Sequence, residues 1–235
     1  MITITTKKEY DLNNMNVAAQ QIQLGSYLKE INTNISGSGK IVSGCAVFGD
    51  STNYTAFEND GTMTLAGSAT VWDDMFFPLT TAKQGQTDKP PFDTNGIGYL
   101  FPQADTTHIM YIIAQFPHSY SLGTSIFPHV HWKQENSGSV VFKMDYKWFN
   151  IGDIVPANFS TYVMEVDTQT YTSGSLHQLT GGSIAITGSH INKVSSLMLI
   201  KLYRDDNTYT GNALTYQFDI HFCKDSLGSR TEYSK

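Results

Sequence analysis

Charged residues are scarce in this chain, and basic residues are the scarcest. Asp, Glu, Lys and Arg make up 15% of its 235 residues, against about 25% in typical soluble domains. The 15 Lys and Arg are outnumbered by 21 Asp and Glu, so the formal net charge is -6. Proteins that bind a nucleic-acid backbone carry clustered positive charge. The composition therefore argues against a nucleic-acid partner.

Cysteine and long apolar segments are also nearly absent. The two cysteines, Cys45 and Cys223, lie too far apart to suggest a disulfide framework or a zinc knuckle, and we expect both to be reduced thiols. No run approaches the roughly 18 apolar residues of a membrane-spanning helix. The first residues lack the apolar stretch of a secretory signal. We expect a protein without a membrane span that is synthesised in a cytoplasm.

The chain is instead rich in residues that favour strands and turns, among them Thr, Ser, Asn and the aromatic residues. Apolar and polar residues alternate with period two in the segments 140–148 and 214–222, where Leu214, Tyr216 and Phe218 begin one apolar face. Strands at short spacing without intervening helices predict an all-β fold, an antiparallel β-sandwich of jelly-roll type. The expected strands are 108–116, 127–133, 139–149, 160–167, 182–187, 196–203 and 213–223.

The N-terminal region has a different pattern, which predicts one helix at about residues 14–31. Positions that would form one face of a helix recur there at steps of four and three residues, the spacing of about two heptads. They are Val17, Gln21, Leu24, Leu28 and Ile31. This stripe can pack on the rest of the chain or on copies of itself around a symmetry axis, with Gln21 as a polar layer. A Gly/Ser-rich joint follows at 35–44. We expect residues 1–44 to form an anchoring and oligomerisation segment and residues 45–235 to form a β-sandwich body.

Two histidines are candidate metal ligands. His129 and His131 lie two residues apart on an expected strand, so both imidazoles are on one face. With Gly123 and Glu135 they have the spacing G-x5-H-x-H-x3-E, which resembles the first motif of the cupins, double-sheet β-barrels that bind a metal through two His, a Glu and a later His. The second cupin motif has no counterpart downstream. Two interpretations stay open: a metal site of His129, His131 and Glu135, or polar residues on the outward face of a strand.

No catalytic constellation accompanies these histidines. The chain contains no P-loop and no G-x-S-x-G nucleophile elbow. Asp219 and His221 share the outward face of the last expected strand, which we interpret as a surface pair. We therefore predict no enzymatic activity, no catalytic residue and no cofactor. A cupin-like metal-binding enzyme is one alternative; a carbohydrate-binding adhesin that uses exposed Tyr and Trp near the long loop 80–98, with a host surface glycan as partner, is another.

Four stretches together resemble a widespread group of tailed-phage virion proteins whose genes lie beside head and tail genes. They are TVWDDMFFP at 70–78, QFPHSY at 115–120, IFPHVHW at 126–132 and FDIHFCKDSLGSRTEYSK at 218–235. The resemblance implies a structural role in the virion, as a capsid decoration, head fibre or tail-associated protein. It also implies a homo-oligomer, first of all a homotrimer, that attaches through its N-terminal segment to capsid, tail or portal proteins.

Overall fold

The structure is a computed structural model that describes residues 46–58, 60–103, 105–136, 138, 140–165, 174, 176–179, 186–205, 209–232 and 234–235. All of these residues belong to one unit of the chain, Ser43–Lys235. The expected helix at 14–31, with its stripe of Val17, Gln21, Leu24, Leu28 and Ile31, lies outside the described residues, as do the joint at 35–44 and Cys45.

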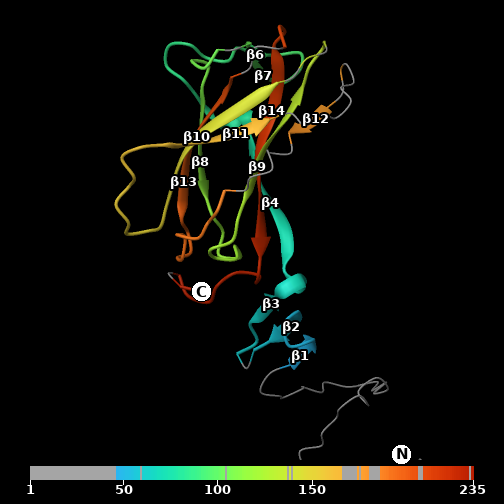
Figure 1. Ribbon diagram of the computed structural model, residues 1–235, viewed down its shortest axis with the longest axis vertical. Coiled ribbons are helices and arrows are strands. Elements are labelled where there is room, and N and C mark those ends of the chain that lie inside the picture. Colours follow the sequence, from blue (N-terminus) through green and yellow to red (C-terminus); the bar gives the residue numbers. More distant parts are fainter. Residues whose placement is uncertain are drawn as a thin grey trace, which may run out of the picture. The chain divides into compact units, whose positions relative to one another are not determined.

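Two antiparallel sheets contain most of the described strands (Figure 1). The five-stranded sheet has the order β11 (Ser160–Glu165), β10 (Val141–Phe149), β13 (Leu197–Arg204), β8 (Met110–Gln115) and β5 (Lys83–Gln84). The six-stranded sheet has the order β12 (Leu176–Leu179), β9 (Phe127–Lys133), β14 (Ala213–Lys224), β7 (Gly98–Phe101) and β6 (Phe92–Asp93), and β4 (Val71–Pro78) also pairs with β14.

A smaller sheet and two short helices complete the described elements. The three-stranded sheet consists of β1 (Ala46–Gly49), β2 (Tyr54–Phe57) and β3 (Met63–Ala66). The 3-10 helices η2 (Gly67–Ala69) and η3 (Leu79–Thr81) precede and follow β4. Within the described part of the chain, no helix is long and apolar enough to cross a membrane.

The strand order of the two large sheets is that of a jelly roll. From β7 to β10 the chain changes sheet at every connection, and it does so again from β11 to β14. All pairings between these strands are antiparallel. The prediction of an all-β antiparallel sandwich of jelly-roll type is therefore confirmed.

Most of the expected strands are present at the expected places. β9 coincides with the segment 127–133, and the ends of β8, β10, β11, β13 and β14 lie within two residues of those expected. The other described strands, β1 to β7 and β12, are not among those expected. The segment 80–98, expected as a loop, contains the short strands β5 and β6, because their backbones pair with β8 and β7. The expected strand at 182–187 is described only from residue 186, and Ile186 forms an isolated bridge with Ile126.

The apolar core lies between the two large sheets. β8 alternates buried and exposed residues along its whole length, and β13 alternates half-buried and buried ones. The ring of Phe101 in β7 contacts that of Phe142 in β10 across the core, with 5.4 Å between centroids. Phe116 stacks on Trp148 at 4.6 Å. Burial of these inward faces stabilises the fold by about 25 cal/mol for each Å² removed from water.

A β-bulge in β14 changes one detail of the expected core. The register with β9 shifts between Thr215 and Gln217, so Tyr216 is an extra residue. An extra residue displaces the alternation of faces by one position. Thr215 is fully buried, Tyr216 is only half-buried, and Leu214 is not part of the core cluster. The expectation that Leu214 and Tyr216 share one inward face with Phe218 is therefore wrong.

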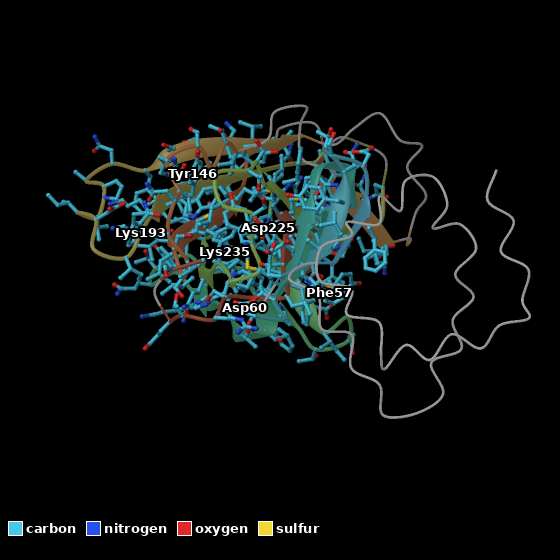
Figure 2. The ribbon with its side chains drawn as sticks, turned by 90° about the horizontal axis from the view of Figure 1, so that it is seen from below. Phe57, Asp60, Tyr146, Lys193, Asp225 and Lys235 are labelled. Carbon is cyan, nitrogen blue, oxygen red and sulfur yellow. The ribbon has the colours of Figure 1, made fainter. Side chains whose placement is uncertain are left out.

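The C-terminal tail folds back onto the sandwich. Nζ of Lys235 donates hydrogen bonds to the backbone carbonyls of Ser119 at 3.3 Å and Tyr120 at 2.6 Å. The same group pairs with the carboxylate of Asp225, and Figure 2 shows the two residues side by side. The backbone N–H of Leu65 donates to the carbonyl of Asp225 at 2.7 Å. The residues after β14 therefore connect the sandwich with β3.

Candidate functional site

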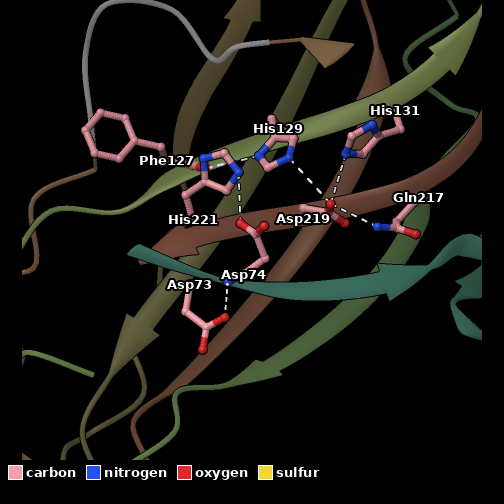
Figure 3. A network of polar contacts seen from close by, with 8 residues as sticks. All are labelled: Asp73, Asp74, Phe127, His129, His131, Gln217, Asp219 and His221. Atoms are coloured by element: carbon pink, nitrogen blue, oxygen red, sulfur yellow. Dashed lines mark hydrogen bonds and ion pairs between the residues drawn. The ribbon is translucent and has the colours of Figure 1, made fainter. Parts of the chain in front are cut away.

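The outward face of the six-stranded sheet carries a group of histidine and aspartate side chains (Figure 3). His129 and His131 belong to β9, Asp219 and His221 to β14, and Asp74 to β4. The strand register brings them together, because His129 lies opposite Asp219 and His221 lies opposite Asp74. We call these five residues the His/Asp cluster.

Asp219 is at the centre of the His/Asp cluster. Its Oδ2 atom lies 2.9 Å from Nε2 of His131 and 3.5 Å from Nε2 of His129. Nε2 of Gln217 donates a hydrogen bond to the same oxygen at 2.9 Å. The other oxygen, Oδ1, is buried and has no hydrogen-bond partner among the residues that the structure describes. One ligand atom from each of His129, His131 and Asp219 lies within 4.8 Å of the others.

Burial decreases from the centre of the cluster outward. His129 is 2% exposed and Asp219 4% exposed, whereas the side chain of His131 is 21% exposed. Burial raises the pKa of Asp219, but hydrogen bonds from His129, His131 and Gln217 more than offset it and hold the pKa of this carboxyl well below its usual range. Asp219 is therefore a buried carboxylate at neutral pH.

His221 extends the cluster toward β4. Its Nε2 atom lies 2.8 Å from Oδ1 of Asp74, and the centroid of its ring is 4.2 Å from that of His129. Burial, together with the neighbouring His129, lowers the pKa of His221, although Asp74 opposes this change. The His221 ring is therefore mainly neutral at pH 7.

The structure places Glu135 outside the His/Asp cluster. Glu135 follows the end of β9, is mostly exposed and pairs with Lys133 at 2.6 Å. The structure thus brings His129 and His131 together with Asp219, not with Glu135. The signal for Asp219 in the sequence is its outward position in the last alternating strand. Alternation alone does not say which strand lies beside it.

Two depressions share the lining residues Lys133 and Tyr216, and one of them borders the His/Asp cluster. That one, of about 540 Å³, is lined by His131, Lys133, Gly174, Leu176, Tyr216 and Gln217. The other, of about 510 Å³, includes Asp93 at the end of β6 and Asn95 after it, with Asn136 and Tyr216 among its other lining residues.

Other histidines with described side chains contact single partners or serine hydroxyls. Nδ1 of His108 lies 2.7 Å from a carboxylate oxygen of Asp105. Nε2 of His118 lies 2.8 Å from the hydroxyl of Ser195. Nε2 of His190 donates to the carbonyl of Trp148 at 3.1 Å. None of these three histidines belongs to a described group of three or more metal-ligand side chains.

Comparison with known proteins identifies no family. No family model matches the chain, and no curated protein matches it. A chain in the structure of infectious bursal disease virus Gt strain aligns with 10% sequence identity and a TM-score of 0.25 over 76% of this chain. The Gx strain of that virus gives 11% identity and a TM-score of 0.16 over 81%. This chain spans 45% and 54% of the length of those two viral chains.

Proposed function

We propose that this chain is a structural component of a phage virion, an oligomeric β-sandwich protein that attaches to the particle through residues 1–44. The role is that of a capsid decoration, head fibre or tail-associated protein, and the assembly is a homotrimer. Its function is to join proteins and not to catalyse a reaction.

The observation that carries this proposal is an exposed apolar edge strand. β4 pairs with β14 along one side, and no other described strand pairs with its second side. Trp72 is 60% exposed and Phe76 is 64% exposed. Unpaired backbone groups along an apolar edge are a template for pairing with another chain. The exposed Asp74 lies between these two aromatic side chains on the same face of β4, and aromatic residues are enriched at protein–protein interfaces.

One of the exposed aromatic side chains of β4 also contacts the neighbouring part of the sheet. The ring of Trp72 contacts that of Phe127 in β9 edge to face, with 5.4 Å between centroids. Three of the four stretches that resemble phage virion proteins meet here, because 70–78 contains β4, 126–132 overlaps β9 and 218–235 contains the second half of β14. Their convergence on an exposed surface supports an assembly role.

The absolute mass of the purified full-length chain tests the oligomer. Light scattering should give a trimer, and the double variant Trp72→Ser/Phe76→Ser should weaken association by about 30-fold or more, since truncation of an interface aromatic residue costs about 1 kcal/mol or more. Ile154→Ser is the control, because Ile154 is 94% exposed but lies in the connection between β10 and β11. A monomeric wild-type chain would contradict the oligomer.

Purified particles of the encoding phage test the location. Mass spectrometry should detect the chain as a stoichiometric component of the virion. A chain without residues 1–44 should remain folded, as judged by its circular dichroism spectrum, but should no longer join particles. Absence of the full-length chain from the virion would overturn the proposal, and incorporation of the truncated chain would overturn the role of residues 1–44.

Glycan binding is a second candidate function, favoured by the depression of about 510 Å³. Its lining residues include Asp93, Asn95, Asn136 and Tyr216. Their carboxylate and amide groups can bind sugar hydroxyls, and the aromatic ring can stack on the face of a sugar. A glycan array should give hits that Tyr216→Ala removes and Ile154→Ser retains. An array without hits would exclude this second function for the glycans tested.

A further inference from the structure

We propose that His129, His131 and Asp219 bind a divalent transition-metal ion, with Zn²⁺ as the first expected ion, on the outward face of the six-stranded sheet. The site lies within one chain and connects β9 with β14. It is independent of the virion role, since neither proposal requires the other.

Three ligand groups converge because of the strand geometry. His129 and His131 are two residues apart on β9, which puts both rings on one face, and Asp219 lies opposite His129 in the register of β14. Their ligand atoms lie within 4.8 Å of one another. Around tetrahedral zinc, bonds of about 2.0–2.2 Å place ligand atoms about 3.3 Å apart. Small rotations of the side chains suffice to reach that arrangement.

The hydrogen bond of His129 orients the ring for metal binding. Nδ1 of His129 lies 3.4 Å from the backbone carbonyl of Phe127, a group that can only accept a hydrogen bond. In the tautomer with its proton on Nδ1, the Nε2 atom of His129 would present a lone pair to a metal ion that Asp219 also binds, and Oδ2 of Asp219 lies 3.5 Å from this Nε2 atom. A backbone carbonyl behind the second ring nitrogen is the usual outer-shell partner of a metal-binding histidine.

Asp219 supplies the second, independent observation. Its Oδ1 atom is buried without a hydrogen-bond partner among the described residues. Such an oxygen costs free energy unless a donor or a cation meets it. Gln217 already holds Oδ2 and so fixes the plane of the carboxylate. Both imidazoles face Oδ2, so a metal ion would also satisfy Oδ1 if the carboxylate bound it through both oxygens.

The ligand set determines the class of ion. Two imidazole nitrogens and one carboxylate oxygen suit Zn²⁺, Co²⁺, Ni²⁺ or Cu²⁺, whereas Ca²⁺ and Mg²⁺ prefer sites made of oxygen ligands. Three protein ligands leave at least one position for water or another ligand. His131 borders the depression of about 540 Å³, which gives an ion access from solvent.

Metal titration of the untagged full-length protein, freed of metal by a chelator, tests the site. Calorimetry should show one Zn²⁺ bound per chain, and Co²⁺ should produce visible absorption bands of a low-symmetry site with nitrogen and oxygen ligands. His131→Ala and Asp219→Asn should each weaken binding by more than about 100-fold, the upper end of the effect of losing an outer-shell partner. Zn²⁺ should also raise the thermal unfolding midpoint of the wild type, because it binds the folded state alone.

Two variants are matched controls. His108→Ala removes a histidine that pairs with Asp105 outside the cluster, and Glu135→Gln removes the ligand that the sequence spacing predicts. Both should bind Zn²⁺ as the wild type does. Thermal unfolding without metal shows whether each variant folds. If Asp219→Asn does not fold, His131→Ala still tests the site, because the side chain of His131 is partly exposed. No binding by the wild type, equal binding by His131→Ala, or a loss in Glu135→Gln would overturn this ligand set.

Discussion

The two outward faces of the sandwich carry similar residue types in different environments. On the five-stranded sheet, Asp145 of β10 is half-buried and accepts hydrogen bonds from the hydroxyls of Thr161 at 2.7 Å and Tyr203 at 3.2 Å. Neighbouring Lys143 pairs with Asp205 at 2.5 Å. On the six-stranded sheet, Asp219 is almost completely buried and is surrounded by imidazole rings.

This contrast teaches that the alternation of residues along a strand does not identify a site, whereas burial of its outward polar residues does. Exposed ion pairs contribute about 0–1 kcal/mol and need no further explanation. A buried carboxylate with one unpaired oxygen is costly, and such groups concentrate at functional sites. The six-stranded face is therefore the functional candidate.

The largest expected difference between the two faces is in the cost of removing their central carboxylates. In chelator-treated protein, Asp219→Ala should lower the free energy of unfolding by about 3 kcal/mol, because it breaks a buried network of charged and polar groups. Asp145→Ala should lower it by about 1 kcal/mol or less. Urea unfolding followed by tryptophan fluorescence measures both. Equal losses of unfolding free energy in Asp219→Ala and Asp145→Ala would contradict the difference in burial between the two faces.

A smaller difference is expected for the donors that orient these carboxylates. Gln217→Ala removes the 2.9 Å hydrogen bond to Asp219 and should lower the free energy of unfolding by about 1 kcal/mol. Thr161→Ala removes the 2.7 Å hydrogen bond to Asp145 at an exposed position and should change it by less than about 0.5 kcal/mol. The same urea experiment applies, and the reverse order of the two effects would contradict the contrast in burial.

The last expected effect appears only at alkaline pH, on the five-stranded face. Burial and the nearby Asp145 raise the pKa of Tyr203 to about 12, above the value of about 10 for an unfolded chain. Between about pH 10 and 12 the folded state therefore retains a proton that the unfolded state loses, and stability falls as pH rises. Tyr203→Phe should reduce that fall in the urea midpoint. Burial also raises the pKa of Tyr120 to about 12, and Tyr120 is present in both the wild type and the Tyr203→Phe variant. An equal fall of the urea midpoint in the two proteins would therefore show that Tyr203 does not cause it.

Strand positions were predictable where a long segment alternates apolar and polar residues. The alternation in 140–148 predicts β10, whose Phe142, Met144 and Trp148 are buried. The bulge at Tyr216 was not predictable, because an extra aromatic residue leaves the polarity pattern intact while it displaces the faces of the strand. β4 was missed because its exposed apolar residues and its two aspartates follow no simple alternation.

The candidate site was only half predictable. His129 and His131 share a face because they are two residues apart on one strand, and local geometry settles that. Their partner Asp219 is 88 residues from His131 in the sequence, so spacing pointed to Glu135 instead. The N-terminal stripe, the trimer, the phage origin and the attachment through residues 1–44 stay predictions.

The amino-acid sequence by itself determined the all-β class, the positions of the six strands β8, β9, β10, β11, β13 and β14, and the pairing of two imidazoles on one face, because these follow from a period of two and from burial of apolar side chains. Tertiary structure alone decided that Asp219 meets those imidazoles and that Trp72 and Phe76 stay exposed at an edge. The register between β9 and β14, and the absence of a described partner along the outer side of β4, depend on contacts between distant segments. Local preference carries no information about such contacts.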